Sequence, residues 1–376
     1  MPNTNVSVVY FSGSRADYAL MVSILNALEK EKRVNLSMVV AHMHLDKRFG
    51  LTIKQIKKDG FKIIGKIKTK INDSSEGMLS EFQVVIKKLP QILLKSKPDF
   101  LLIQGDRVES LAATTVAFLL KIPVIHVSGG CITGSMDNGF RWAITQLSSW
   151  HFPATKTDAQ RIIKTGKSAK TVFLVGEPGL DVVLNMRLEN KKELWKKFNL
   201  SLDKKLFLVI FHPDTAEKRY SPQKQIQPLL EFLEKSPAQV IQVYPNADTG
   251  GLMMRQMIDI KAKEKTNWQR FENLDHRVLL GLFKYTNLVI GNSSGAIVET
   301  PSFKIPVINI GKRQAGRVKT ENIIEVGYER LAIERAVKKA MSKKFFKKTR
   351  QIKNPYGDGT AADKFMKFFK RQVVNL

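Results

Sequence analysis

The feature that most constrains the fold is a repeated alternation of short apolar runs with helix-like segments. Continuous apolar runs occur at Val6–Phe11, Asp99–Gln104 and Ile122–Val127. A helix-like segment, Asp17–Lys30, follows the first run, and Phe82–Lys95, before the second, has the 3.6-residue apolar spacing of a helix. Continuous apolar strands separated by helices predict a parallel sheet that helices cover on both faces.

The alternation has two halves. In the first half, further strands are predicted at NLSMVV, HFPAT and TVFLVG, the last of which is its final strand. Further helices are predicted at Val108–Leu120, Asp137–Ser149 and Asp158–Thr165. After Glu177-Pro178-Gly179 comes a charged stretch, Asn190–Lys205, which we interpret as the domain junction. The second half has apolar runs at LFLVIF (Leu206–Phe211), AQVIQVYP, NLVIG (Asn287–Gly291) and IPVINI (Ile305–Ile310).

We therefore predict an α/β protein with two Rossmann-like doubly wound domains, residues 1–184 and 185–376. The final segment, Ala361–Gln372, is a candidate helix for packing back on the first domain. A length of 376 residues agrees with two domains, because single cores rarely grow beyond ~250–300 residues.

Composition indicates a soluble cytoplasmic protein. The only cysteine, Cys131, excludes an internal disulfide and fits a reducing compartment. The N-terminus lacks the pattern of a signal peptide, and no apolar run reaches the ~20 residues of a membrane-spanning helix. We therefore expect no integral membrane segment.

The net charge of +28 raises the question of a nucleic-acid partner. The positive residues are scattered along the chain, with denser runs at Lys191–Lys205 and Lys338–Lys353. No Cys/His finger and no aromatic RNA-binding signature accompanies them. We favour a general lysine bias of solvated surfaces over nucleic-acid binding, while attraction to anionic ligands or to an anionic membrane surface stays open.

No cofactor or metal ion is expected. The turn after the first strand reads SGSRADY and lacks the G-x-G-x-x-G fingerprint, and Gly166-Lys167-Ser168 lacks the first glycine of a P-loop. His42 and His44 would share a strand face, but no H-E-x-x-H motif or cysteine pair accompanies them. His126 lies inside an apolar run and is interpreted as a core histidine.

Polar residues gather where the predicted strands end, which is where open α/β sheets bind ligands. These positions are Ser14-Arg15, Gly105–Glu109, Ser128–Cys131, Phe211–Asp214 and Gly291–Gly295. In the last of these, small residues at a helix start leave backbone N–H groups for an anion such as a diphosphate.

Together these residues resemble a known family. The segments SGSRADYALM, MHLDKRFG, QGDRVESLAA, IPVIHVSGG, TGSMDNGFRWAIT, FHPDT, YPNADTG, GNSSGAIVE and GKRQAGR are similar to the hydrolysing UDP-N-acetylglucosamine 2-epimerases, including those of sialic-acid and legionaminic-acid pathways. The match covers nearly the whole chain in order. It implies a type B glycosyltransferase-like fold with a UDP-sugar in the central cleft, and a homo-oligomer.

The resemblance also implies a reaction: elimination of UDP across C1–C2, then addition of water to give the 2-epimer. Asp106, Asp137 and His212 would be catalytic. The substrate-binding residues would be Arg15, Arg107, Ser128, Cys131, Arg141, Asn246, Ser293, Ser294, Gly295, Glu299 and Arg313. Among them, Ser293–Gly295 would hold the diphosphate, and Glu299 would accept hydrogen bonds from the ribose hydroxyls.

The chain departs from the family pattern near the sugar. Where the family usually reads H-I-E-G-G-E, this chain has Ser128 and Cys131 in place of the two glutamates. It also has Asn138, Trp142 and Gln146 where the family often has an acidic residue, a histidine and a lysine. A hydroxyl or thiol is a poor substitute for a carboxylate proton carrier at neutral pH.

Three interpretations stay open. The protein is a 2-epimerase with altered chemistry, a UDP-sugar-binding pseudoenzyme, or another lyase or transferase on the same scaffold. The 2-epimerase is preferred, because most of the cleft pattern survives. Its product would be N-acetylmannosamine or a 2,4-diacetamido analogue for surface-glycan synthesis.

Overall fold

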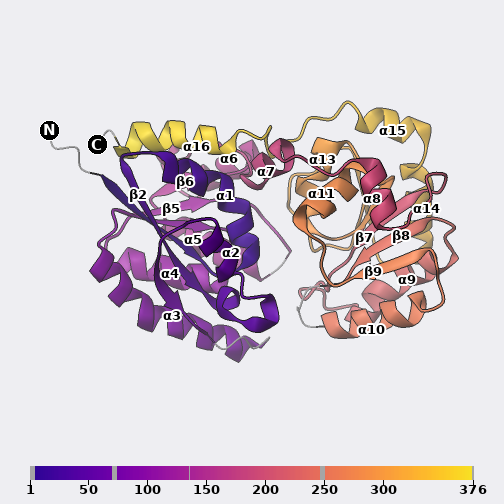
Figure 1. The fold of residues 1–376 in the computed structure, drawn as a ribbon, viewed down its shortest axis with the longest axis horizontal. Coiled ribbons are helices and arrows are strands. Elements are labelled where there is room, and N and C mark those ends of the chain that lie inside the picture. The colour runs from indigo at the N-terminus through magenta and orange to yellow at the C-terminus, as the bar shows by residue number, and fades with distance from the viewer. Residues whose placement is uncertain (1–4, 70–73, 135, 246–249, 375–376) are drawn as a thin grey trace. The chain divides into compact units, whose positions relative to one another are not determined.

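The computed structural model describes residues 5–69, 74–134, 136–245 and 250–374, and it divides into two compact units (Figure 1). The first unit holds Met1–Cys131, Met136–Asn185 and Pro355–Leu376. The second holds Ile132–Ser135 and Met186–Asn354. The second unit therefore ends at Asn354, whereas the sequence pattern predicted a second domain of residues 185–376.

The first unit is built on a six-stranded parallel sheet. Its strands are β1 (Val6–Ser12), β2 (Val34–Ala41), β3 (Ile63–Ile67), β4 (Phe100–Gln104), β5 (Val124–Val127) and β6 (Trp150–Phe152). They pair in the order β3-β2-β1-β4-β5-β6, which is the order of the Rossmann fold. The order reverses between β1 and β4, so the predicted doubly wound arrangement is confirmed.

Helices cover both faces of this sheet. They are α1 (Arg15–Lys30), η1 (His42–Leu45), η2 (Lys47–Phe49), α2 (Ile53–Lys58), α3 (Ser75–Ser96), α4 (Val108–Leu119), α5 (Asp137–Leu147), α6 (Lys156–Lys164), η3 (Ala169–Thr171), α7 (Gly179–Asn185), α16 (Ala361–Phe369) and η4 (Lys370–Val374). Successive side chains of a strand point to opposite faces. In β1, Tyr10 packs into one apolar layer while Val9 and Phe11 pack into the other. This two-sided burial explains the continuous apolar runs.

The second unit repeats the architecture. Its strands are β7 (Leu206–Ile210), β8 (Gln239–Val243), β9 (Trp268–Phe271), β10 (Leu288–Gly291), β11 (Val307–Ile310) and β12 (Ile323–Val326). They pair in parallel in the order β12-β11-β10-β7-β8-β9, with the reversal between β7 and β10. Its helices are α8 (Lys191–Lys197), α9 (Pro222–Lys235), α10 (Gly251–Ala262), α11 (His276–Tyr285), α12 (Ser294–Val298), α13 (Thr300–Phe303), α14 (Arg330–Ala340) and α15 (Lys343–Thr349).

The structure corrects the expected strands at the sheet edges. The segment TVFLVG is not a strand, because only one bridge, from His151 to Val172, joins it to β6. Three edge strands were not predicted from the sequence: β3, β9 and β12. The charged stretch assigned to the junction includes α8 rather than forming a loop throughout.

The C-terminal segment belongs to the first unit. Helix α16 contacts α1 and α7 and lies along the indigo α1 in Figure 1. The carboxylate of Asp181 accepts hydrogen bonds from the backbone N–H groups of Ala361 and Ala362 at 2.8 and 2.7 Å. Phe365 is fully buried, and its ring centroid lies 4.6 Å from that of Phe152. A backbone cap and an aromatic contact thus fix this helix on the sheet.

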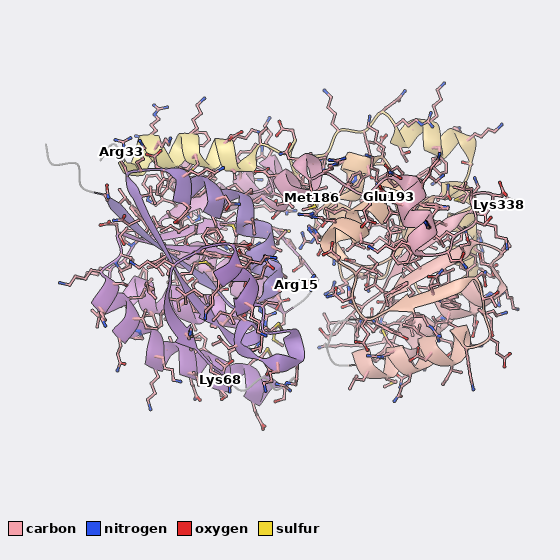
Figure 2. All side chains as sticks on the ribbon, in the orientation of Figure 1. Arg15, Arg33, Lys68, Met186, Glu193 and Lys338 are labelled. Carbon is pink, nitrogen blue, oxygen red and sulfur yellow. The ribbon has the colours of Figure 1, made fainter. Side chains whose placement is uncertain are left out.

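Charged side chains project from the surfaces of both units. In Figure 2, Lys68 of the first unit and Lys338 of the second are labelled examples, and both are exposed. In the described part of the chain, no helix combines the length and apolar character needed to cross a membrane.

Candidate active site

The turn after β1 is organised around a buried carboxylate. Asp17 accepts hydrogen bonds from the backbone N–H groups of Gly13 and Ser14 at 3.0 and 2.8 Å, and from the hydroxyl of Ser12. Burial raises the pKa of Asp17 to about 6, against the opposing effect of these hydrogen bonds. Arg15, predicted to bind substrate, is the first residue of α1 and is exposed. The capped turn therefore presents Arg15 at the surface (Figure 2).

His44 extends this network and does not share a face with His42, contrary to expectation. Its Nε2 lies 2.8 Å from Ser12 Oγ, and its Nδ1 lies 2.7 Å from Thr52 Oγ1. Burial lowers the pKa of His44 to about 4, so the ring is neutral at neutral pH. His42 instead faces α3 and α4, where it meets Glu81 and Glu109.

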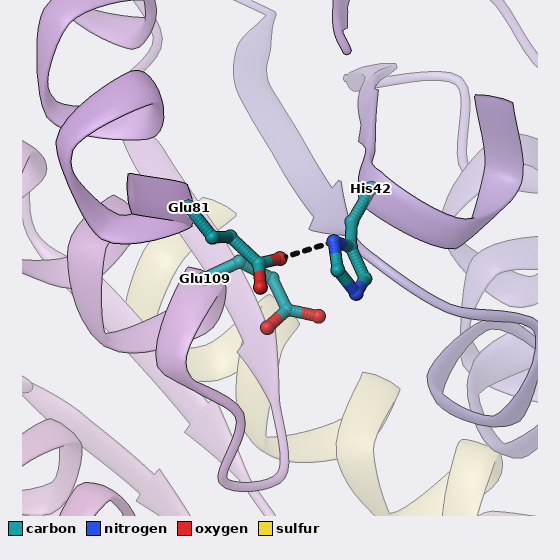
Figure 3. Close-up of side chains that lie close together, drawn as sticks. All are labelled: His42, Glu81 and Glu109. Carbon is teal, nitrogen blue, oxygen red and sulfur yellow. Dashed lines mark ion pairs between the residues drawn. The ribbon is translucent and has the colours of Figure 1, made fainter. Parts of the chain in front are cut away.

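Figure 3 shows this second cluster, which combines side chains from η1, α3 and α4. His42 Nδ1 lies 2.5 Å from Glu81 Oε1, and the donor atoms of His42, Glu81 and Glu109 all lie within 4.8 Å of one another. These donors are types that bind metal ions. However, Arg107 forms an ion pair with the buried Glu109. The guanidinium of Arg107 therefore already offsets negative charge in this cluster.

The pKa values agree with that arrangement. Burial opposes ionisation of Glu109, but the guanidinium of Arg107 outweighs it and lowers the pKa of Glu109. Burial and the charge of Glu109 raise the pKa of Glu81. Arg107 was predicted to bind substrate, and the structure places it against Glu109. A substrate contact of Arg107 stays a prediction.

The ends of β4 and β5 bring several predicted residues together. The two strands are adjacent, with Gly105 N–H donating to Val127 O at 3.2 Å. Asp106, which follows β4, forms an ion pair with the buried Arg141 of α5. The same guanidinium donates to the carbonyl of Cys131 at 3.0 Å. Asp106, Arg141 and Cys131 thus form one cluster at this edge of the sheet.

Ser128, which follows β5, has a side-chain partner that the sequence did not predict. Its φ of 60° lies in the left-handed region, which is uncommon for residues other than glycine. Its hydroxyl donates to the carboxylate of Glu177 at 3.0 Å. A residue 49 positions away thus places a carboxylate beside Ser128.

Two other residues of this half have clear positions. Asp137 is exposed in the first turn of α5, one turn before Arg141, so the two share a helix face. His126 is completely buried, and its Nε2 donates to Gly105 O at 2.8 Å. Burial lowers the pKa of His126 to about 4. The interpretation of His126 as a core histidine is therefore confirmed.

In the second unit, Asn292 ties together the loops at the point where the strand order reverses. Its side chain accepts from His212 N–H at 2.7 Å and donates to His212 O at 2.8 Å. Its carbonyl accepts from the side chains of Arg313 and Gln314 at 3.3 and 3.0 Å. Predicted residues His212 and Arg313 are thus held in one site, together with Asp214, whose pKa is raised by burial against the opposing charge of Arg313.

The predicted diphosphate segment starts at the same place. Gly291 has a φ of 149°, and an added Cβ would collide with the backbone of Ile210, so only glycine fits there. Ser293, Ser294 and Gly295 follow, half-buried, at the start of α12. An added Cβ on Gly295 would lie 3.2 Å from the carboxylate of Glu299, which therefore lies close beside this turn. Asn246 lies outside the described residues.

Five of these polar residues had no individual role predicted from the sequence: Asp17, Glu81, Glu109, Glu177 and Asn292. Asp17 and Glu109 stand within quoted motifs, and Asn292 stands within GNSSGAIVE, so position after a strand was an available signal. Glu81 and Glu177 meet their partners only through the tertiary fold, and no local pattern marks them.

Comparison with known proteins agrees with this arrangement. The family model described as UDP-N-acetylglucosamine 2-epimerase matches residues 26–370. A UDP-N,N'-diacetylbacillosamine 2-epimerase (hydrolyzing) of Legionella pneumophila is 33% identical over 364 residues, 96% of this chain and 95% of its own. A GDP/UDP-N,N'-diacetylbacillosamine 2-epimerase (hydrolyzing) of Campylobacter jejuni is 34% identical over 338 residues, 89% and 87% of the two chains.

The fold is similar to that of a solved structure. The structure of UDP-GlcNAc 2-epimerase from Neisseria meningitidis bound to UDP-GlcNAc has a TM-score of 0.84 at 20% identity, covering 98% of this chain and all of its own. The family match and the relatives confirm the likeness found in the sequence motifs. The chain belongs to the UDP-N-acetylglucosamine 2-epimerase family.

Proposed function

We propose that this protein is a hydrolysing 2-epimerase that releases UDP from a UDP-2-acetamido sugar. The observation that carries the proposal is the family match over residues 26–370 together with the Asp106–Arg141 pair at the ends of β4 and β5. Asp106 places at these strand ends a carboxylate, a group able to transfer protons, and Arg141 orients it. The substrate is UDP-N-acetylglucosamine or a 2,4-diacetamido relative, the latter supported by the names of the Legionella and Campylobacter relatives.

The reaction divides into two steps. In the first, a base removes the proton from C2, the electron pair forms the C1=C2 double bond, and UDP leaves C1 with its bonding pair. In the second, water adds at C1 while an acid delivers a proton to C2 from the other face. We assign the C2 chemistry to the first unit, with Asp106 and Asp137 as acid–base candidates.

UDP binding is assigned to the second unit. Ser293, Ser294 and Gly295 offer backbone N–H groups and hydroxyls to the diphosphate, and Arg313 adds positive charge. His212, held by Asn292, would donate to the departing phosphate oxygen. Glu299 would accept from the ribose hydroxyls.

One measurement tests the proposal. The protein is incubated in D₂O with UDP-N-acetylglucosamine and, separately, with UDP-N,N'-diacetylbacillosamine. We expect free UDP from at least one of them, with deuterium at C2 of the released sugar. UDP binding without UDP release from either sugar would contradict the proposal.

A second function is a UDP-sugar-binding protein without turnover. It is favoured by Ser128 and Cys131, which stand where the family pattern has glutamates. The same incubation separates the two functions, because a binding protein raises no free UDP. A cytoplasmic location, a homo-oligomer and the absence of a nucleic-acid partner stay predictions.

A further inference from the structure

The hydroxyl of Ser128 forms a hydrogen bond with the carboxylate of Glu177. Ser128 Oγ lies 3.0 and 3.2 Å from the two carboxylate oxygens of Glu177. Both side chains are half-buried. The carboxylate therefore lies at the rim of the sheet, where a solute can reach it, and is oriented by a hydroxyl that follows β5.

The backbone holds both residues in place. Ser128 N–H donates to Phe152 O at 3.0 Å, and Glu177 N–H donates to Tyr356 O at 2.7 Å. Gly176 has a φ of 98°, and an added Cβ would lie 2.9 Å from Tyr356 O. The left-handed φ of Ser128 is costly, and such conformations persist where the surrounding structure enforces them, often at functional sites.

Ser128 and Glu177 lie at the strand ends that also carry Asp106. Ser128 follows β5, and Asp106 follows the adjacent β4, with Arg141 binding both Asp106 and the Cys131 carbonyl. Of the other carboxylates found at these strand ends, Asp17 and Glu109 are buried, at 5% and 0% exposure. Asp106 and Glu177 are the half-buried ones at the β4–β5 edge.

We propose that Glu177 is a catalytic residue that accepts the proton from C2 of the sugar. This role rests on the function proposed above, and it places the acid–base carboxylate on a different loop from the one where the family pattern has it. The C2–H bond breaks toward Glu177, the electron pair forms C1=C2, and the C1–O bond breaks with UDP leaving.

The cycle then closes with water as the only further reactant. Water adds its oxygen to C1, and a second carboxyl group, Asp106 or Asp137, delivers a proton to C2 from the other face. The proton lost by the water restores that carboxyl group. Glu177 returns its own proton to solvent. Ser128 is a positioning residue in this scheme, because it acts through Glu177.

The first experiment compares Glu177→Gln with the wild-type protein and with Glu29→Gln, an exposed control on α1. Glutamine keeps the shape and can still accept from Ser128. We expect UDP release to fall ~10²–10⁴-fold in Glu177→Gln, with UDP affinity and melting temperature unchanged. The pH profile of any residual activity should lose its acidic limb. Ser128→Ala should cost less, about 10–100-fold, the worth of one hydrogen bond to a charged group.

The second experiment exchanges the two side chains. Ser128→Glu combined with Glu177→Ser moves the carboxylate across the contact while avoiding two adjacent carboxylates, whose repulsion would raise one pKa. The double variant should recover UDP release relative to Glu177→Ser alone. Because it compares two other variants, this experiment tests the role of Glu177 even if Glu177→Gln folds poorly.

The outcomes separate the two proposals. An active wild-type protein whose Glu177→Gln variant is equally active would overturn the role of Glu177 and leave the function intact. No recovery in the exchange variant, with its fold and UDP binding preserved, also counts against Glu177. A wild-type protein that releases UDP from neither sugar would overturn the proposed function, and the role of Glu177 with it.

Discussion

The two units have the same strand order but different chemistry where their strands end. In the first unit, the residues at the strand ends include four carboxylates: Asp17, Asp106, Glu109 and Glu177. Each contacts a guanidinium or a hydroxyl. In the second unit, the corresponding loops carry His212, Asn292, Arg313 and the small residues Ser293–Gly295. One scaffold therefore presents two unlike sites.

The difference suits a division of roles between the two units. Carboxylates move protons, whereas free N–H groups, hydroxyls and a guanidinium hold a diphosphate. A shared fold does not dictate which of these a sheet edge carries, because the loop residues alone decide it. Substitutions in the first unit should therefore lower turnover, and those in the second should weaken UDP binding.

The sharpest test of this division is Asp106→Asn. Loss of an acid–base carboxylate should reduce UDP release by ~10²–10⁴-fold. The rise in melting temperature that UDP produces should stay as in the wild-type protein, because the nucleotide would be held by the other unit. Asp363→Asn, exposed on α16 of the same unit, is the control. An equal loss of UDP binding in Asp106→Asn would break the division.

The second test asks whether the units respond separately to damage in the core. Phe365 is completely buried and packs on Phe152 and Phe369. Phe365→Ala should destabilise the first unit by about 3–5 kcal/mol, and Lys367→Ala on the exposed side of α16 should change little. Hydrogen exchange should show lost protection in the first sheet and α1. Equal loss of protection in the second sheet would show that the units unfold together.

The third test concerns the cost of burying Asp17. Its pKa is raised from 3.8 in the unfolded chain to about 6 in the folded one. The folded protein therefore binds the proton more tightly, and this stabilisation is full below pH 4 and lost as the pH rises through about 6. The free energy of unfolding should fall across this window by on the order of 3 kcal/mol from Asp17 alone.

Asp17→Asn removes that titration while keeping an oxygen that can accept from Gly13 or Ser14. Urea unfolding between pH 4 and 7 should show a flatter stability profile for this variant. Asp203→Asn, exposed in the second unit, should retain the wild-type slope. A slope unchanged in Asp17→Asn would mean that other groups control stability in this range.

Much of the fold could be predicted from the sequence, for a physical reason. Central strands such as β1 and β10 are buried on both faces, so each appears as a continuous apolar run. The strands that were missed, β3, β9 and β12, include half-buried and charged positions, for example Lys66, Arg270 and Glu325. Partial exposure removes the continuous run that makes a strand visible in sequence.

The candidate site could be predicted less completely. Residues that directly follow a strand, such as Asp106 and His212, are marked by their position and were found. Glu177 meets Ser128 only because the segment that contains Val172 and Val175 runs alongside β6 and Glu177 is held by Tyr356. Such a contact depends on tertiary geometry, and a single sequence contains no local signal for it.

The smallest expected effect, on UDP affinity, completes the comparison. Glu299 lies beside Gly295 in the second unit, and its N–H donates to Gly295 O at 2.8 Å. If its carboxylate accepts from the ribose hydroxyls, Glu299→Ala should weaken UDP binding about 10–100-fold, the worth of a hydrogen bond to a charged group. Calorimetric titration with UDP measures this, with Glu264→Ala, an exposed glutamate of the same unit, as control.

At saturating substrate the turnover of Glu299→Ala should stay close to that of the wild-type protein, because the ribose contact is the same before and after C2 loses its proton. Unchanged UDP affinity in Glu299→Ala would remove the ribose assignment, and a fall in turnover with unchanged affinity would place Glu299 in the chemistry that we assign to the first unit.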